Sequence, residues 1–156
     1  MKETSAALLE FPQLKQLIER FVQSCYGQRE LERLEPVTDR AWLESELAAT
    51  REAIEYLRSA GGDSPSGRQR TAPLGFTAIP DCRQALAKLH IAGTVLQCQE
   101  LLDIAALAAR VADIKRALQL PPQQFPFLAS CASRLVDLSP LVTKIEETIL
   151  PDGTVS

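Results

Sequence analysis

The sequence is poor in the residues on which most catalytic and metal sites depend. Its 156 residues include one histidine and four cysteines, and only 5% of them are aromatic. The cysteines, Cys25, Cys82, Cys98 and Cys131, lie far apart, without a C-x-x-C pair or a histidine cluster at the spacing of zinc ligands. We therefore expect four free, mostly buried thiols and no metal site.

Long apolar runs are absent as well, which excludes a membrane-spanning helix. Such a helix needs about 18 uninterrupted apolar residues, and even the alanine-rich segment from Leu101 carries Asp103, Arg110 and Asp113. The first residues do not resemble a signal peptide, because acidic residues and a proline interrupt their apolar run. The sequence thus predicts a cytoplasmic protein.

A strong excess of positive charge is also missing. The chain has 17 basic and 20 acidic residues and a formal net charge of -3, so it is not a protein that binds nucleic acid over its whole surface. Residues 61–120 carry 7 basic and 5 acidic side chains, a weak positive signal that a solvated helix face would also explain. Contact with DNA or RNA must be local, and Arg68 and Arg70 are the first candidates.

The sequence does contain a series of amphipathic patterns, which indicate an all-α fold. Apolar residues recur at steps of three and four, in a background rich in leucine, alanine, glutamate and arginine. We predict about six amphipathic helices from seven helical segments, at residues 6–25, 28–35, 38–59, 80–93, 97–118, 125–135 and 139–148.

Caps, glycines and prolines give the predicted boundaries of these helices. We expect a break at Gly27, a cap at Thr38 or Asp39, a helix start at Pro80, and Ser139 and Pro140 as cap and first residue of the last helix. Residues 61–72, which are rich in glycine and serine, are predicted to be a flexible linker inside a single unit that spans residues 1–156.

Two apolar stripes stand out. The first lies in residues 38–59 and consists of Leu43, Leu47, Ile54 and Leu57, with Thr50 at the missing step; its 4-3-4-3 spacing suits a long antiparallel helix partner. The second lies in residues 97–118 and consists of Ile104, Leu107, Val111, Ile114 and Leu118. Core packing is the default interpretation of both stripes, because amphipathic helices must cover one another. A surplus stripe would be a groove for a partner.

The chain ends on a turn signal. Asp152-Gly153 lies between short apolar runs at 148–150 and 154–155, a pattern typical of a β-hairpin with a very short second strand. We expect a truncated β-hairpin here, and a chain that is a fragment of a longer protein.

No set of residues in the sequence forms a recognisable catalytic or nucleotide site. Gly62 to Gly67 has the G-x-x-x-x-G spacing of a phosphate loop, but Arg68 and Gln69 follow it where lysine and a hydroxyl residue are needed. His90, the single histidine, has no acidic residue three or four positions away. We therefore predict no catalytic and no cofactor-binding residue, and we leave the nucleic-acid-binding residues unassigned.

Paired carboxylates give no stronger signal. Glu44 with Glu46, and Glu146 with Glu147, lie on predicted helices that also carry cations. Solvated helix faces explain such pairs without catalysis.

A co-linear series of short motifs runs along the whole chain. In order they are Leu9-Glu10-Phe11, Ser24-Cys25-Tyr26-Gly27, Leu34-Glu35-Pro36, Ala72-Pro73-Leu74-Gly75, Gly93-Thr94-Val95-Leu96, Glu100-Leu101-Leu102-Asp103-Ile104, Leu138-Ser139-Pro140-Leu141 and Ile149-Leu150-Pro151-Asp152-Gly153. The series resembles the amino-terminal region of the second subfamily of bacterial MutS paralogues. Gln97-Cys98, where the family often has Ser-Pro, and a longer linker at 61–70 depart from it.

The resemblance implies a role in a larger protein. It implies that residues 1–156 are the amino-terminal part of a helical core and lever domain, which in full-length members leads to a DNA clamp, an ATPase that uses ATP and magnesium, and usually a Smr endonuclease domain. It further implies a homodimer that acts on branched DNA and suppresses recombination, and in some members rescues collided ribosomes. None of the family's functional residues falls in this chain. The alternative is a freestanding helical adaptor that binds a partner helix.

Overall fold

The computed structural model describes residues 10–60, 74–119, 123–150 and 153–154, and helices dominate all of this part of the chain. They are α2 (Phe11–Glu19), α3 (Cys25–Arg33), α4 (Arg40–Ala60), α5 (Arg83–Lys88), α6 (Cys98–Ala117), α7 (Pro126–Ser133) and α8 (Ser139–Thr148). The predicted all-α fold is thereby confirmed for the described residues.

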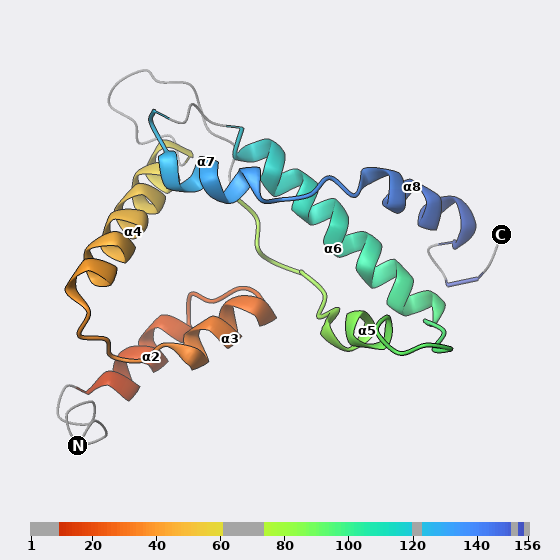
Figure 1. Cartoon of the computed structure of the whole chain (residues 1–156), viewed down its shortest axis with the longest axis horizontal. Helices are drawn as coiled ribbons and strands as arrows, with labels where there is room; N and C mark the ends of the chain where they lie inside the picture. The colour runs from red at the N-terminus through yellow and green to blue at the C-terminus, as the bar shows by residue number, and fades with distance from the viewer. Residues whose placement is uncertain (1–9, 61–73, 120–122, 151–152, 155–156) are drawn as a thin grey trace.

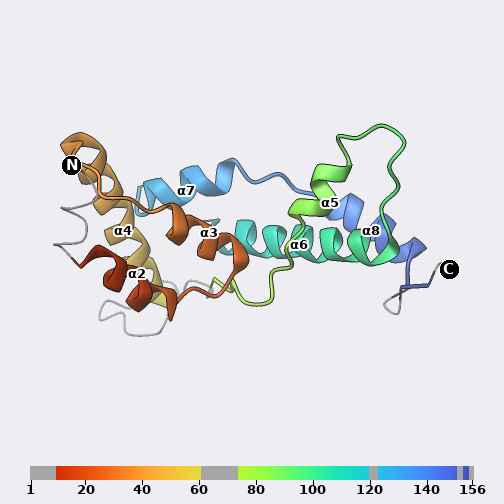
Figure 2. The same cartoon turned by 90° about the horizontal axis from the view of Figure 1, so that it is seen from below.

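Helix α6 is the axis of the structure (Figure 1). Helix α8 packs along its first half, and α7 lies near its carboxyl end (Figures 1 and 2). Helix α4 packs on α7 and diverges from α6, while α2 and α3 form a separate pair. The arrangement is open, because no described helix packs on more than two others.

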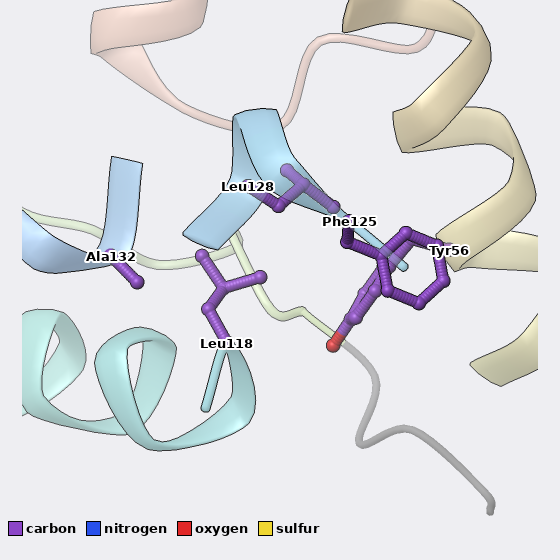
Figure 3. Packing of buried hydrophobic residues seen from close by; sticks show 5 residues of the cluster. All are labelled: Tyr56, Leu118, Phe125, Leu128 and Ala132. Atoms are coloured by element: carbon purple, nitrogen blue, oxygen red, sulfur yellow. The ribbon is translucent and has the colours of Figure 1, made fainter. Parts of the chain in front are cut away.

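The first core cluster joins three helices (Figure 3). It consists of Tyr56 from α4, Leu118 after α6, Phe125 before α7, and Leu128 and Ala132 from α7. The rings of Tyr56 and Phe125 meet edge to face, with centroids 5.8 Å apart and planes at 79°. Both rings are only 1% exposed, so this aromatic pair holds α4 on α7 largely through apolar burial.

A carboxylate from α4 caps α7 beside this cluster. Helix α7 begins with Pro126, which has no N–H, so the next two amides are the first unpaired donors of the helix. Glu52 accepts both: the N–H of Phe127 donates to Oε2 at 3.1 Å, and the N–H of Leu128 donates to Oε1 at 2.7 Å. The Glu52 side chain thus acts as the N-cap of α7, although it comes from another helix, and it places a negative charge at the positive end of the helix dipole.

The second core cluster fills the contact between α6 and α8. Ala105, Ile145 and Ile149 are its buried members, and side chains of α6 and α8 border it. Small residues at Ala105 and Ala108 let the two helices approach closely, and both are almost fully buried. The prediction that the Ile104-to-Leu118 stripe is the buried face of α6 is therefore only partly right: Leu118 is buried, and the alanine side is more buried than the rest of the stripe.

The amino-terminal helix is shorter than predicted. Helix α2 ends at Glu19, and α3 begins at Cys25, so Gly27 lies inside a helix instead of breaking one. The reason is the cap at Ser24, whose Oγ accepts the Gly27 N–H at 3.1 Å. The break falls before this cap, at residues 20–24. Residues 6–9 of the predicted helix lie outside the described part.

Polar side chains hold α2 on α3. Lys15 Nζ donates to the carbonyl oxygens of Glu32 at 2.7 Å and Leu34 at 3.4 Å, at the carboxyl end of α3. Gln28 Nε2 donates to Glu19 Oε1 at 3.0 Å. A cation at that end also interacts favourably with the negative pole of the helix dipole.

The predicted start is confirmed for α4 but not for α5 and α8. Of the two predicted caps of α4, Thr38 and Asp39, it is Asp39 whose Oδ1 accepts the Trp42 N–H at 3.1 Å. Helix α5 starts at Arg83 instead of Pro80, because the Asp81 carboxylate accepts the Arg83 N–H and fixes the first turn there. Helix α8 begins at Ser139 itself, one position before the start that was predicted.

The predicted β-hairpin is wrong: among the described residues no strand follows α8. A turn is present, with Gly153 at φ 82°, its N–H bonded to the Leu150 carbonyl, and the Leu150 N–H bonded to the Thr154 carbonyl. These bonds close the turn, but they do not extend into a ladder, and an isolated hairpin this short has little stability. Asp152 lies outside the described residues.

We predict that Glu52→Ala lowers the free energy of unfolding by about 1–2 kcal/mol, because two amides of α7 lose their acceptor. Urea unfolding followed by circular dichroism measures the change. Glu46→Ala, an exposed glutamate on the same helix, is the matched control and should alter stability by less than about 0.5 kcal/mol. Equal effects of the two substitutions would contradict the capping role.

Candidate functional site

The residues tested for catalysis are dispersed in the structure. His90 is exposed in the turn after α5, and its N–H is bonded to the Ala87 carbonyl at 3.2 Å. Glu44 is paired with Arg40 at 2.8 Å. Glu46, Glu146 and Glu147 are exposed on their helices. The structure therefore brings none of these groups together into an acid–base pair.

The four cysteines are free thiols, as predicted, but the prediction that most of them are buried is wrong. Cys82 is buried, and burial raises the pKa of its thiol, whereas the other three are only half-buried. Nowhere in the described ranges do three or more metal-ligating side chains gather. Of the helices described, none has the length and apolar character that crossing a membrane requires.

Several predicted features fall on segments that the structure does not describe. They are Gly62 to Gly67, Arg68, Gln69, Arg70 and the predicted linker at 61–72. All of them lie within residues 61–73, outside the described ranges. The hypothesis that Arg68 and Arg70 contact nucleic acid therefore stays a prediction.

The structure does form an open groove, of about 670 Å³, between α3, the segment before α5, and α6. Its lining is mainly apolar and includes Phe21, Val22, Tyr26, Phe76, Ile79, Leu107 and Ile114. Two members, Leu107 and Ile114, belong to the α6 stripe that was predicted to be core. These two side chains of the stripe thus form a wall of the groove, although Ile114 also packs against the first core cluster.

Three arginines also line the groove. Arg33 is paired with Glu30 at 3.3 Å, and Arg83 with Asp81. Arg29, from the same face of α3, forms no ion pair within the residues described. An apolar floor beside an unpaired guanidinium is suited to an apolar or aromatic group that carries an anion nearby.

A polar anchor fixes one end of the groove. The Cys82 N–H donates to the Tyr26 hydroxyl oxygen at 3.3 Å, which ties α3 to the start of α5. Burial raises the pKa of Tyr26, so the phenol is neutral at physiological pH. Cys25 Sγ makes a second, weak contact with the Ile79 carbonyl at 3.9 Å.

The Asp81–Arg83 pair completes this anchor. Arg83 Nε donates to Asp81 Oδ1 at 2.8 Å, and the Arg83 N–H donates to the same oxygen at 3.1 Å. These bonds, first of all the one from the side chain, lower the pKa of Asp81 to about 2 and raise the pKa of Arg83.

The sequence alone did not reveal the groove, because its walls come from three segments that are distant along the chain. Its chemistry is that of binding: the described lining residues contain no nucleophile paired with a base. The class of protein so defined is an open helical segment with an apolar, arginine-lined groove.

Comparison with curated proteins shows which proteins this chain is similar to. The chain is 32% identical over 158 residues to the endonuclease MutS2 of Gemmatimonas aurantiaca, and 27% identical over 158 residues to that of Bacillus velezensis; each match covers 99% of this chain. The endonuclease MutS2 of Latilactobacillus sakei is 21% identical over 94% of the chain. The resemblance to the second bacterial MutS subfamily is thereby confirmed, and the chain is related to the MutS2 endonucleases along nearly all of its length.

The matches cover only a part of those relatives. The chain spans 18% to 19% of their length, which is consistent with an amino-terminal segment of a MutS2-like protein. No family model matches the sequence, and no solved structure matches it.

We predict that the Asp81–Arg83 pair stabilises the fold at neutral pH and stops doing so in acid. The pKa of Asp81 is about 2 in the folded chain against an ordinary 3.8, so its contribution is complete above about pH 4 and is lost as the pH falls toward 2. Asp81→Asn should lower the urea midpoint at pH 7, and the gap to the parent chain should close near pH 2. Glu46→Gln is the control, and a gap that stays constant with pH would contradict the prediction.

Proposed function

We propose that this chain is the structural amino-terminal arm of a MutS-like DNA-binding ATPase that acts on branched DNA. The observation that carries the proposal is the similarity to three MutS2 endonucleases, which is co-linear over 94% to 99% of the chain and covers about a fifth of each relative. In this role the chain is part of the core and lever helices. It gives the parent protein a helical framework and contributes no reacting group.

The open architecture supports this proposal. Large apolar side chains that are at least one-third exposed occur on α2, α4, α5, α7 and α8, among them Leu17, Leu47, Leu86 and Leu141. A freestanding domain covers such faces with its own helices. Exposed faces on this scale suit a segment whose remaining neighbours belong to the parent protein.

The cofactors and partners in this proposal belong to the parent. ATP and magnesium bind its ATPase domain, branched DNA binds its clamp, and two copies form a homodimer in the bacterial cytoplasm. Suppression of recombination is the cellular activity that we assign to the parent first, and rescue of collided ribosomes second. An endonuclease domain of the Smr type is expected at its far end.

A helical adaptor is the second candidate, and the exposed stripe on α4 favours it. Leu47, Ile54 and Leu57 are 53%, 43% and 56% exposed. A freestanding protein with such a stripe would bind a partner helix and no nucleic acid.

The reading frame downstream of Ser156 separates the two candidates. The MutS-like proposal predicts that the frame continues for several hundred residues and contains a phosphate loop with the lysine that Gly62 to Arg68 lacks. A stop codon shortly after Ser156 would overturn the proposal and favour the adaptor.

A biochemical test follows from the same assignment. The purified chain should neither hydrolyse ATP nor bind a four-way DNA junction at 50 mM salt, while the product of the complete gene does both. Junction binding by the chain alone, with affinity that falls steeply as salt rises, would instead support direct contact. Arg68→Glu with Arg70→Glu would then show whether these two cations carry it.

A further inference from the structure

Helix α4 presents a largely uncovered apolar stripe. Its members follow one another at steps of four and three, the spacing of the contact face in paired helices, and they are Leu43, Leu47, Thr50, Ile54 and Leu57. Leu43 is half-buried within the chain, whereas the four later members are exposed, the three apolar ones among them by at least 43%. The exposed part of the stripe thus runs from Leu47 to Leu57.

Thr50 suits this apolar face although it carries a hydroxyl group. Its Oγ1 donates to the carbonyl oxygen of Glu46, one turn earlier, at 2.8 Å, so the hydroxyl has a partner within its own helix. Another helix can therefore cover Thr50 without leaving an unpaired donor.

The stripe is not the face by which α4 is held in the fold. Glu52 and Tyr56 make the contacts with α7. At 100° per residue, Glu52 lies roughly 180° and Tyr56 roughly 140° around the helix from the middle of the stripe. A second helix can therefore cover the stripe while α7 keeps its place.

Five charged residues of α4 lie within roughly 100° of the middle of the stripe. Glu46 is on one border, and the other border carries Arg40, Glu44, Arg51 and Arg58. Glu44 is paired with Arg40 at 2.8 Å, but Arg51 and Arg58 form no ion pair within the described ranges. This border thus has its single acid near the amino end of α4 and two arginines without an ion pair nearer the carboxyl end.

An antiparallel second copy of α4 covers the exposed part of the stripe from end to end. Leu47 faces Leu57 of the second copy, and Thr50 faces Ile54; two-fold symmetry makes each contact twice. Leu43, which is already half-buried, stays outside the contact. Every exposed member of the stripe thereby gains a partner.

The charged border fits the same antiparallel register. Glu44 lies beside Arg58 of the second copy, and this ion pair also forms twice. Glu44 keeps its bond to Arg40, because a carboxylate has two oxygens that accept hydrogen bonds. The two Arg51 side chains approach each other at the two-fold axis, but this one repulsion is set against two ion pairs.

A parallel second copy fits less well. It would place Glu46 beside Arg51 of the second copy, but it would also place Glu44 beside Asp39, so that each attraction is offset by a repulsion. The dipoles of the two helices would also point in the same direction, whereas in an antiparallel pair they attract each other. The charge pattern therefore favours antiparallel pairing.

We propose that the α4 stripe is a self-association face, on which α4 of a second copy of this chain packs in antiparallel orientation with Glu44 beside Arg58. The apolar contacts supply the affinity, and the ion pairs fix orientation and register. The proposal rests on the geometry of α4 and does not rest on the ATPase or DNA-binding roles proposed for the parent. A chain that stays monomeric would overturn it and leave the similarity to the MutS2 endonucleases unchanged.

Sedimentation equilibrium of the complete 156-residue chain, over a range of concentrations, tests the proposal. The chain should form a reversible dimer, which Leu47→Asp converts to a monomer. Leu17→Asp is the matched control, because Leu17, on α2, and Leu47 are each 53% exposed, and this variant should keep the dimer. Circular dichroism checks that each variant is folded. A monomer at all concentrations, a dimer that survives Leu47→Asp, or a dimer that Leu17→Asp abolishes would overturn the proposal.

Exchange of the border charges tests orientation and register. Glu44→Arg and Arg58→Glu should each weaken dimerisation at least about fivefold at low salt, because two attractions become two repulsions. The double variant should restore the dimer. An equimolar mixture of the two single variants should form a mixed dimer, detected by energy transfer between two fluorescent labels, since each copy then carries the charges that the other needs.

Glu46→Arg is the control for orientation. Glu46 faces Ala60 of the second copy in the antiparallel pair, so this variant should dimerise like the parent chain, whereas a parallel pair would lose its contact with Arg51. A dimer weakened by Glu46→Arg, or a double variant of Glu44 and Arg58 that fails to restore the dimer, would overturn the proposed pairing.

Discussion

One carboxylate and one aromatic pair attach α4 to α7. Glu52 reaches from α4 to the first free amides of α7, and the aromatic pair of Tyr56 and Phe125 packs next to it. The charge is well placed because Pro126 removes one unpaired donor and the helix dipole favours an anion at the next two. Since α7 is the helix on which α4 packs, this contact also decides where the leucine stripe of α4 points. A structural cap thereby orients an exposed apolar surface.

Apolar periodicity identified the helices correctly but not the faces that are buried. A stripe in a sequence shows that one side of a helix avoids water, and core and interface satisfy this condition equally. On α4, Leu47 and Ile54 were the obvious core candidates, yet Tyr56 is the buried residue. On α6, the alanines at 105 and 108 are more buried than Leu107, because close approach of α8 needs small residues. Whether an apolar stripe is part of the core or of an interface depends on the helices that pack against it, and the sequence of one helix does not contain this information.

Local polar bonds explain most of the boundaries that the sequence did not predict. Ser24 accepts a hydrogen bond from the Gly27 N–H, and α3 therefore starts where a break was expected. Asp81 accepts a hydrogen bond from the Arg83 N–H at the start of α5 in the same way. A side chain that caps a helix bonds a backbone amide within about three residues of itself. Most loops contain several residues that could do so, and the sequence does not show which of them forms the bond. The groove could not be predicted from the sequence, since Phe21, Phe76 and Leu107 are far apart along the chain and only the fold brings them to one surface. The family resemblance was predictable because it rests on the order of motifs, which folding does not alter.

The contact between Glu52 and Phe127 joins residues 75 positions apart, and this distance matters while the chain is being made. Synthesis at ~5–20 residues per second delivers Phe127 roughly 4 to 15 seconds after Glu52. During that interval α4 has left the ribosome without its capping partner or the ring of Phe125, and its tyrosine face and its leucine stripe are both open to water. Helix α4 therefore reaches its final position only after α7 has been made, so a slower translation rate lengthens the time for which its apolar side chains are exposed.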